Sequence, residues 1–305
     1  MKILVTGSNG TLGIPLMTEL KKRGHDVWGC DLQHGRDPNY IRADISNYRQ
    51  LERVFEGSFD YVYHLAAEFG RINGEEYYDT LWQVNAVGTR NILELQRLHG
   101  FRLIFGSSSE IYGDLHVDPL TEDLPERMPL HQPNDYAMSK WVNELQIMSF
   151  EARYGIEAVR CRFFNAYGPG EYYHSYRSVV CLFCYRALFG IPWEVYEGYH
   201  RVFMYIDDFI STLANVCDRF VPGQVFNIGG REYRSVKDLS DLVLSCTGAD
   251  ASLASSLAED KHNIRSKRPD ITKAVEILGH DPVTTLEVGV PRTLDWMRSI
   301  YKVPK

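Results

Sequence analysis

The chain has 305 residues, 44% of them hydrophobic, and can therefore bury a sizeable core in one large domain with a smaller lobe. Its net charge of −7 and the lack of a basic run argue against nucleic acid as a partner. No apolar run reaches membrane-spanning length and the chain opens on a strand pattern, so we expect a cytoplasmic protein with no membrane partner and with its six scattered cysteines reduced.

The first predicted elements are a strand, a glycine-rich loop and a helix. Residues 2–6 form an apolar run that indicates a strand buried on both faces of a parallel sheet. A helical pattern follows, with Pro15 in its first turn, and it stops at Gly24. Three glycines, each three positions from the next, permit a tight turn and a close approach of the backbone to a pyrophosphate at the helix N-terminus. The predicted dinucleotide contacts in this loop are Gly7, Asn9, Gly10, Thr11, Leu12 and Gly13.

A second predicted strand, residues 26–31, carries information on the choice of dinucleotide. It ends in Asp31, whose carboxylate can accept the ribose hydroxyls of the adenosine half. The same carboxylate repels the 2′-phosphate of NADP, so NAD is the favoured cofactor, although the nearby Arg36 leaves NADP open.

Strands predicted at 40–44 and 61–67, with a helix from Ser46 between them, continue the alternation. This rhythm indicates an α/β fold with a Rossmann-type, doubly wound parallel sheet, in which ligands bind at the carboxyl ends of the strands. Further candidate cofactor contacts at these strand ends are Asp44 and Ile45, which would flank the adenine, and Leu65, Ala66 and Ala67.

The polar stretch 68–74 is predicted to be a loop at one of these strand ends. Its Glu68 and Arg71 are candidates for the rim of a substrate site, and they are equally typical of solvated loop charges. The helix that follows carries Asn85, another candidate cofactor contact, and Gly88. A glycine inside a helix costs about 1 kcal/mol relative to alanine, which suggests close packing at that point.

A fifth predicted strand, residues 101–105, runs into three serines and a glutamate at 107–110. Tyr136 and Lys140 then stand four positions apart and so share one face of a helix predicted from 135 to about 154. An ammonium group near a phenol favours the phenolate and lowers the pKa of the tyrosine, which makes Tyr136 a candidate general base. Taken alone, the same spacing is more typical of an ordinary surface helix.

The regular alternation lapses soon after the following strand, and we place the domain boundary there. Residues 1–165 are expected to form the dinucleotide-binding domain, joined again by parts of 200–235, including a strand at 224–228. Residues 166–305 are expected to form a smaller α/β lobe that binds the substrate. No metal is assigned, because Cys181 and Cys184 supply only half of a zinc pattern and no histidine has ligand spacing.

The order of the motifs resembles the extended short-chain dehydrogenase/reductase family, which includes nucleotide-sugar epimerases and dehydratases. The resemblance covers nearly the whole chain and implies an NAD-dependent lyase or isomerase that forms a homodimer through helices near Asn85 and Tyr136. Besides the glycine loop, the resemblance rests on His64-Leu-Ala-Ala67, Ser-Ser-Glu-Ile-Tyr-Gly at 108–113, Tyr136-x-x-x-Lys140, Arg162-Phe-Phe-Asn165-Ala-Tyr-Gly-Pro169, Arg201 and Arg268-Pro-Asp-Ile-Thr-Lys-Ala274.

The resemblance also assigns site residues. A serine or threonine four residues before the Tyr-Gly pair completes a triad with Tyr136 and Lys140 in that family, which selects Ser108. The next two positions, Ser109 and Glu110, separate the activities within the family. Dehydratases acting at C4 and C6 carry Thr-Asp-Glu or Thr-Ser-Glu, decarboxylases carry Thr-Ser-Glu, and 4-epimerases usually carry small neutral residues.

For the lobe, the resemblance implies a nucleoside-diphosphate sugar as the substrate. Asn165 would contact the sugar-phosphate, and Arg201 and Arg268 would hold the pyrophosphate through bidentate hydrogen bonds. Secondary candidates for contact with the pyrophosphate are the basic residues Arg177, Arg265 and Lys267.

The implied reaction begins with transient oxidation at C4 of the sugar. Tyr136, as phenolate, takes the proton of the 4-hydroxyl while Ser108 hydrogen-bonds the same oxygen and hydride passes to NAD. Oxidation acidifies the C5 proton, which Glu110 could remove while water leaves from C6. We therefore favour 4,6-dehydration.

Three alternatives stay open. If Glu110 takes no part, the keto sugar could be reduced on its other face, which is 4-epimerisation. Decarboxylation of a nucleotide-linked glucuronate shares the glutamate motif, but the arginine usual after Tyr-Gly-Pro in such enzymes is here Gly170. A dinucleotide-binding regulator without catalysis is a different class, and such proteins generally lose the Tyr or the Lys that this chain keeps.

Overall fold

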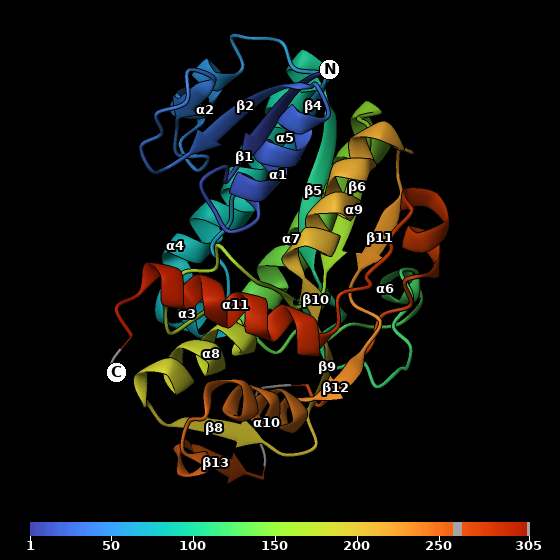
Figure 1. Ribbon diagram of the computed structural model, residues 1–305. Coiled ribbons are helices and arrows are strands. Elements are labelled where there is room, and N and C mark those ends of the chain that lie inside the picture. The colour runs from blue at the N-terminus through green and yellow to red at the C-terminus, as the bar shows by residue number, and fades with distance from the viewer. Residues whose placement is uncertain (259–263, 304–305) are drawn as a thin grey trace.

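The computed structural model describes residues 1–258 and 264–303 and is built around one parallel sheet. The strand order is β11-β6-β5-β4-β1-β2-β3, and each neighbouring pair is parallel (Figure 1). The strands of this sheet are β1 (Lys2–Thr6), β2 (Asp26–Asp31), β3 (Tyr40–Arg42), β4 (Tyr61–His64), β5 (Arg102–Ser108), β6 (Ala158–Phe163) and β11 (Val225–Ile228). The order places β1 beside both β2 and β4, the doubly wound arrangement that the sequence predicts.

Helices cover both faces of the sheet because successive side chains of a buried strand point to opposite faces. In β1, Ile3 and Val5 pack in one core with α1 and α9, whereas Leu4 packs in a second core with α2, α5 and α7. The helices of this part are α1 (Gly13–Lys22), α2 (Tyr48–Val54), α3 (Arg71–Glu76), α4 (Tyr78–Trp82), the π-helical η1 (Gln83–Val87), α5 (Gly88–His99), α7 (Asp135–Tyr154) and α9 (Ile206–Asp218).

The remaining elements form a smaller lobe at the carboxyl ends of the sheet strands, together with the segments that join it to the sheet. Figure 1 shows α8, α10, β8 and β13 gathered at the end of the molecule away from the N-terminus. The bounds are η2 (Ser109–Tyr112), α6 (Leu124–Arg127), β7 (Ala166–Tyr167), α8 (Val179–Phe189), β8 (Trp193–Tyr196), β9 (His200–Val202), β10 (Met204–Tyr205), β12 (Tyr233–Ser235), α10 (Val236–Thr247), η3 (Ala251–Leu253), β13 (Ala254–Leu257), β14 (Ser266–Lys267), η4 (Ala274–Leu278) and α11 (Leu286–Ile300).

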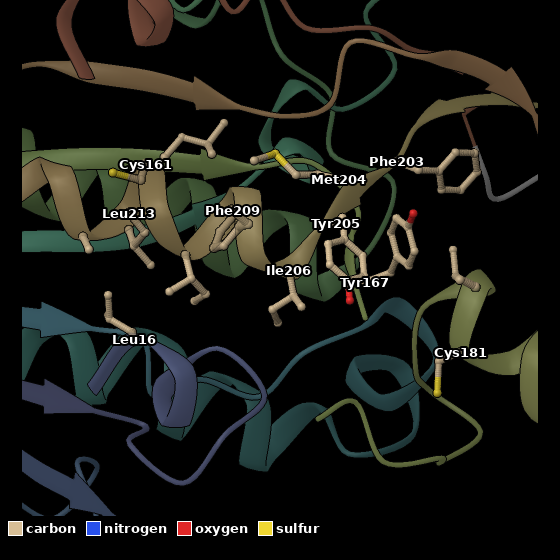
Figure 2. Close-up of a cluster of buried hydrophobic side chains, with 14 of the residues drawn as sticks. Leu16, Cys161, Tyr167, Cys181, Phe203, Met204, Tyr205, Ile206, Phe209 and Leu213 are labelled. Atoms are coloured by element: carbon tan, nitrogen blue, oxygen red, sulfur yellow. The ribbon is translucent and has the colours of Figure 1, made fainter. Parts of the chain in front are cut away.

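Helix α9 connects the lobe to the sheet through a continuous apolar core. Its Phe209 and Leu213 lie between Cys161 of β6 and Leu16 of α1 (Figure 2). The same core runs on through Tyr205 and its neighbours into the lobe (Figure 2). Because burial of apolar surface is the main stabilising term in folding, this shared core holds the lobe at a fixed place over the strand ends.

The predicted strands at 2–6 and 26–31 and the predicted helix at 135–154 are confirmed. The close packing predicted for Gly88 is confirmed as well, because a Cβ atom there would lie 2.7 Å from Cδ1 of Ile45. The division of the chain at residue 165 stays a prediction, although β11 does pair with β6 in the main sheet.

Four predicted elements had wrong boundaries. The stretch 68–74 is not all loop, because α3 begins at Arg71. The strands predicted at 40–44 and 61–67 end at Arg42 and His64, where pairing with the next strand stops. The strand predicted to end at residue 105 runs on to Ser108, because its last two residues still pair with β6. The longer strand fixes the position of Ser108, which is its last residue.

None of the helices in the described part of the chain is both long and apolar enough to cross a bilayer.

A buried ion pair joins helix α7 to the sheet. The Arg162 guanidinium donates from Nε and Nη2 to the two carboxylate oxygens of Glu144, at 3.0 and 2.8 Å. The Ser107 hydroxyl donates to the same carboxylate at 2.5 Å, and Arg162 also donates to the Tyr112 hydroxyl at 2.9 Å. Both charged side chains are at most 2% exposed. Burial alone would raise the pKa of Glu144, but Arg162 outweighs it and holds that pKa below its ordinary value.

We expect Arg162→Met to lower the free energy of unfolding by about 3–5 kcal/mol, because the buried Glu144 carboxylate loses its bidentate partner and keeps only the Ser107 hydroxyl and Arg160, which is 3.8 Å away. The double variant Glu144→Leu/Arg162→Met should recover much of this loss, since apolar side chains can replace a buried pair. Urea unfolding followed by circular dichroism measures both. Arg102→Met, which breaks an exposed pair with Glu157, is the control and should cost far less. A change for Arg162→Met as small as that of the control would contradict the role given to the buried pair.

Candidate active site

A cavity of about 600 Å³ lies between the carboxyl ends of the sheet strands and the lobe. One wall is made by Ser108 and Glu110 after β5 and by Tyr136 at the start of α7. The opposite wall comes from the lobe and is rich in aromatic and basic side chains: Tyr176, Arg177, Phe183, Arg186, Trp193, Tyr196, Tyr199 and Arg201. A concave site of this size, with polar groups converging on an apolar lining, is typical of small-molecule binding.

The glycine loop after β1 has the close packing that a dinucleotide cradle needs. A Cβ atom on Gly13 would lie 2.2 Å from the carbonyl oxygen of Gly7, and one on Gly7 would lie 2.7 Å from the amide nitrogen of Ala66. Gly7 also has a φ of 73°, in the left-handed region that favours glycine. No side chain therefore covers the backbone at Gly7 and Gly13, as contact with a pyrophosphate requires. The glycine loop fits NAD.

Asp31 lies at the end of β2, beside this loop, as predicted. Its carboxylate accepts a hydrogen bond from the backbone N–H of Asn9 at 3.0 Å and from that of Gln33 at 3.1 Å. Asp44 accepts from the backbone and hydroxyl of Ser46, so it also shapes its own turn. The side chain of Ile45 is buried in the core and packs on Gly88. Only the backbone of Ile45 is therefore left for the adenine contact that the sequence predicts.

Asn85 is bound on all sides by protein groups. Its carboxamide accepts from the backbone N–H of Glu68 at 2.8 Å and donates to the Glu68 carbonyl at 3.0 Å and to the Ser139 hydroxyl at 3.0 Å. It thereby ties the segment after β4 to helix α7. Sequence reasoning had selected Asn85 only as a cofactor contact and missed this positioning role. The cofactor contacts of Asn85, Leu65, Ala66 and Ala67 stay predictions.

Tyr136 and Ser108 meet at the cavity, as the resemblance implied. Tyr136 is in the first turn of α7, which begins there because the Asn134 side chain accepts a hydrogen bond from the Ala137 N–H at 2.8 Å. The Tyr136 phenol is hydrogen-bonded to Ser108, the last residue of β5. The Lys140 ammonium lies 6.0 Å from the centre of the Tyr136 ring. The structure thus brings the three predicted catalytic residues together.

The expected effect of Lys140 on the tyrosine is not observed. Burial raises the pKa of Tyr136 to about 12, Ser108 opposes the rise through its hydrogen bond, and the Glu110 carboxylate adds to it. The Lys140 ammonium instead donates to the Gly106 carbonyl at 2.8 Å. Burial lowers the pKa of Lys140 to about 8. The sequence placed Lys140 on the right helix face but could not show how strongly burial acts on both groups.

Glu110 forms an ion pair with Lys267, a residue of the lobe 157 positions away. The carboxylate is 33% exposed, through the cavity, while the lysine is 3% exposed. Burial alone would raise the pKa of Glu110, but Lys267, Arg201 and Arg71 outweigh it and hold the pKa below its ordinary value. Glu110 is therefore an ionised carboxylate on the same wall as Tyr136, with Ser109 buried beside it.

Neither Lys267 nor Arg268 is among the described residues that line the cavity, although both were candidates for contact with the pyrophosphate, and only Lys267 reaches the site, through its pair with Glu110. Arg268 was predicted to hold a pyrophosphate, but among the described residues that line the cavity it is absent. It is exposed and donates to Asp118 at 2.6 Å. Lys267 ends β14 and Arg268 follows it directly; burial alternates along this stretch, with Ser266 and Arg268 exposed and Lys267 buried, so that Lys267 turns inward and Arg268 outward. Arg265 is also exposed and does not reach the lining.

Arg71, Arg177 and Arg201 do line the cavity. Arg177 lies 4.5 Å from the centre of the Phe69 ring and donates to the Thr11 hydroxyl at 3.5 Å, so it connects the glycine loop with the lobe. Arg201 is buried on β9 beside Glu110. These positions suit the recognition of phosphate oxygens by guanidinium groups.

Asn165 lines the cavity in a left-handed backbone conformation, with a φ of 42°. Its amide donates to the Val202 carbonyl at 3.0 Å, which fixes β9 beside the end of β6. Glu68 accepts from the Asn73 amide at 2.9 Å.

Sequence reasoning missed Arg186 and Trp193, which come from α8 and β8. The signal for Trp193 was the Trp-x-x-Tyr-x-x-Tyr spacing at 193–199, which had no motif to support it, and the sequence around Arg186 carried no such signal.

Comparisons with known proteins agree with this geometry. Residues 3–229 match a model described as the NAD dependent epimerase/dehydratase family. UDP-glucuronic acid decarboxylase 1 of Xenopus tropicalis is 30% identical over 97% of this chain and 72% of that protein. The UDP-glucose 4-epimerase of Thermotoga maritima, solved with UDP-glucose, has a TM-score of 0.89 at 28% identity and matches over 98% of this chain and 99% of that one.

A third relative has yet another activity. The dTDP-glucose 4,6-dehydratase of Streptomyces venezuelae, solved with NAD bound, has a TM-score of 0.87 at 26% identity and matches over 98% of both chains. These matches span the sheet, the glycine loop and the lobe alike, and they confirm the resemblance drawn from the sequence. The chain belongs to the NAD dependent epimerase/dehydratase family.

Proposed function

We propose that this protein catalyses the 4,6-dehydration of a nucleoside-diphosphate sugar through transient oxidation at C4. The observation that supports this reaction is Glu110, a carboxylate held ionised by Lys267 on the cavity wall that also carries Ser108 and Tyr136. A 4-epimerase needs no base at C5, whereas a dehydratase does. The glycine loop and Asp31 would hold the cofactor, and the Asp31 carboxylate favours NAD over NADP.

Each residue has a role in this reaction. NAD, when bound, supplies the hydride acceptor for C4 and a positive nicotinamide ring. Tyr136 takes the proton of the sugar 4-hydroxyl, and Ser108 donates or accepts a hydrogen bond at the same oxygen. The pKa of Tyr136 is about 12 and Lys140 alone does not lower it, so loss of the phenol proton at neutral pH would depend on the positive charge of bound NAD as well as on the Lys140 ammonium, 6.0 Å from the ring centre. Glu110 then takes the C5 proton.

The lobe wall suits the diphosphate and the base of the substrate. Arg177, Arg186 and Arg201 bring positive charge to a protein whose overall charge is negative, and guanidinium groups bind phosphate oxygens in a bidentate manner. Trp193 and Tyr196 offer flat aromatic faces at the same wall. A nucleoside diphosphate sugar therefore fits this cavity better than a neutral sugar.

A second candidate is decarboxylation of a nucleotide-linked uronate. Three cations, Lys267, Arg201 and Arg71, act on the carboxylate of Glu110, so this part of the cavity attracts negative charge and would suit a carboxylate on the sugar. The 30% identity to a UDP-glucuronic acid decarboxylase also favours it. Gly170, in place of the arginine usual after Tyr-Gly-Pro in such enzymes, counts against it.

We also propose that two copies form a dimer through the outer faces of α4, α5 and α7. Apolar side chains on these helices and on η1 between them remain exposed, among them Tyr78, Val87, Met138 and Leu145. Exposed apolar side chains gathered on adjacent helices are typical of an interface.

Light scattering at micromolar concentration should therefore give twice the mass of the chain, and Leu145→Glu should shift the protein toward the monomer, because it would bury a charge in the interface. Val283→Glu, at an even more exposed apolar position away from these helices, is the control and should leave the mass unchanged. A parent protein that runs as a monomer would rule the dimer out.

The reaction is tested most directly by Glu110→Gln. A dehydratase would still oxidise C4 but could not remove the C5 proton, so reduced cofactor should accumulate and its absorbance should persist with substrate present. The assay would use dTDP-glucose, UDP-glucose and UDP-glucuronic acid in parallel. Tyr136→Phe is the control, since loss of the acid-base group should block oxidation itself, with a decrease in turnover of about 10²–10⁴-fold.

The other outcomes identify the other reactions. An active Glu110→Gln variant without stalled reduced cofactor, together with no deuterium at C5 after turnover in deuterated water, would exclude dehydration and favour 4-epimerisation. Release of carbon dioxide from UDP-glucuronic acid would favour the decarboxylase. A parent protein that binds NAD but turns over none of these sugars would leave the regulator as the better interpretation.

The pairing of Glu110 with Lys267 predicts a change in pH dependence. Lys267→Met removes the nearest cation, so the pKa of Glu110 should rise. If turnover needs the ionised carboxylate, the acidic limb of the kcat profile should move to higher pH, and activity should be lost first at low pH. Arg268→Met is the matched control, because the Arg268 side chain points outward to Asp118. The pH profile of this variant should match that of the parent. An unmoved acidic limb in Lys267→Met would contradict a role for ionised Glu110.

A further inference from the structure

Three side chains with metal-binding atoms meet outside the cavity, where the chain leaves α1 and where α9 ends. A ring nitrogen of His25, Sγ of Cys217 and a carboxylate oxygen of Asp218 all lie within 4.8 Å of one another. His25 stands just before β2, whereas Cys217 and Asp218 are the last two residues of α9. None of these residues lines the cavity or takes part in the reaction proposed above.

The imidazole of His25 points into this group without a hydrogen bond. Nε2 is buried and has no partner within hydrogen-bonding distance, since the nearest Asp218 oxygen, Oδ1, is 3.7 Å away. A buried nitrogen left unpaired costs about 1–3 kcal/mol and is uncommon in native proteins. An imidazole nitrogen that carries no hydrogen has a lone pair and is a common metal ligand.

The two residues of α9 complete a mixed set of donors. The Cys217 thiol is buried, 3.3 Å from the Ala214 carbonyl and 3.9 Å from Oδ1 of Asp218. Arg23 donates to Oδ2 of the same carboxylate at 3.3 Å, which leaves Oδ1 toward His25. The Asp218 side chain is 42% exposed, so water can reach the group from one side.

We propose that His25, Cys217 and Asp218 bind a divalent transition-metal ion, with Zn²⁺ as the preferred ion. One sulfur, one nitrogen and one oxygen ligand with water in the fourth position is a coordination that Zn²⁺ accepts. Zinc distances of about 2.3 Å to sulfur and about 2.0 Å to nitrogen or oxygen would draw the three atoms closer together than they now lie. Coordination replaces the thiol proton of Cys217, which leaves to solvent, and the sulfur binds as the thiolate.

The ion would fasten the start of β2 to the end of α9, next to a contact that already exists. Arg23 donates to the Asn215 side chain at 2.8 Å and to the Ser211 carbonyl at 3.3 Å, so α1 and α9 are joined at the same corner. The guanidinium charge of Arg23 opposes a cation there. Binding should therefore be weaker than in a site with two cysteines.

Cobalt provides a spectroscopic test on the tag-free chain. Co²⁺ bound to a thiolate gives a sulfur-to-metal charge-transfer band, and equilibrium dialysis gives its stoichiometry. We expect one ion per chain, displaced by Zn²⁺, with this band present. Cys217→Ser should abolish the band and weaken binding by more than about tenfold, the least that loss of even an outer-shell partner of a metal typically costs. Cys246→Ser, at a partly buried free thiol outside this group, is the control and should keep both the band and the affinity for Co²⁺.

Two further variants keep the test decisive should Cys217→Ser fail to fold. Asp218→Asn changes an exposed side chain and His25→Gln changes a ligand outside the helix, and each should weaken binding by a similar factor, with circular dichroism as the check on folding. An unchanged band in Cys217→Ser, or a parent chain that binds no Co²⁺ at a stoichiometry near one, would overturn the proposal. Neither readout depends on turnover, so the outcome is independent of the proposed reaction.

Discussion

The buried pair of Glu144 and Arg162 is the interaction on which the site depends. Glu144 lies one turn beyond Lys140 on α7, and its carboxylate accepts from β6 through Arg162 and from β5 through Ser107. The helix that carries the tyrosine and the strand that carries Ser108 are therefore held by one carboxylate. Removal of two charges from water costs free energy, and an ion pair this deeply buried offsets that cost only when its hydrogen bonds are complete. Here both carboxylate oxygens of Glu144 accept hydrogen bonds.

This network reaches beyond α7. Arg162 donates to Tyr112, whose hydroxyl donates to the Asn227 side chain of β11 at 2.7 Å. The Asn227 amide donates in turn to the Leu120 carbonyl at 2.9 Å, which fixes the long segment before α7. The last strand of the sheet, which returns from the lobe, is thus connected by hydrogen bonds to the helix that holds Tyr136. A rigid second layer of this kind is what positions catalytic groups accurately.

Above this layer, the site gathers ionisable groups whose surroundings change their charge. Burial raises the pKa of Tyr136 and lowers that of Lys140, while cations hold the pKa of Glu110 below its ordinary value. Groups with opposing shifts in one cavity are typical of acid-base catalysis. The low dielectric that produces the shifts also strengthens the attraction between Glu110 and Lys267.

The sequence alone determined the parallel sheet, the glycine loop, Asp31 and the helix face of Tyr136 and Lys140. These features depend on residues close together in the chain, where hydrophobic period and glycine spacing record the local backbone. The tertiary structure decided the rest, because its contacts join residues far apart. Only folding shows that Lys267 and not Arg268 turns inward to meet a carboxylate 157 positions away. Likewise, His25 meets Cys217 only because α1 packs against α9, a contact that no local pattern records.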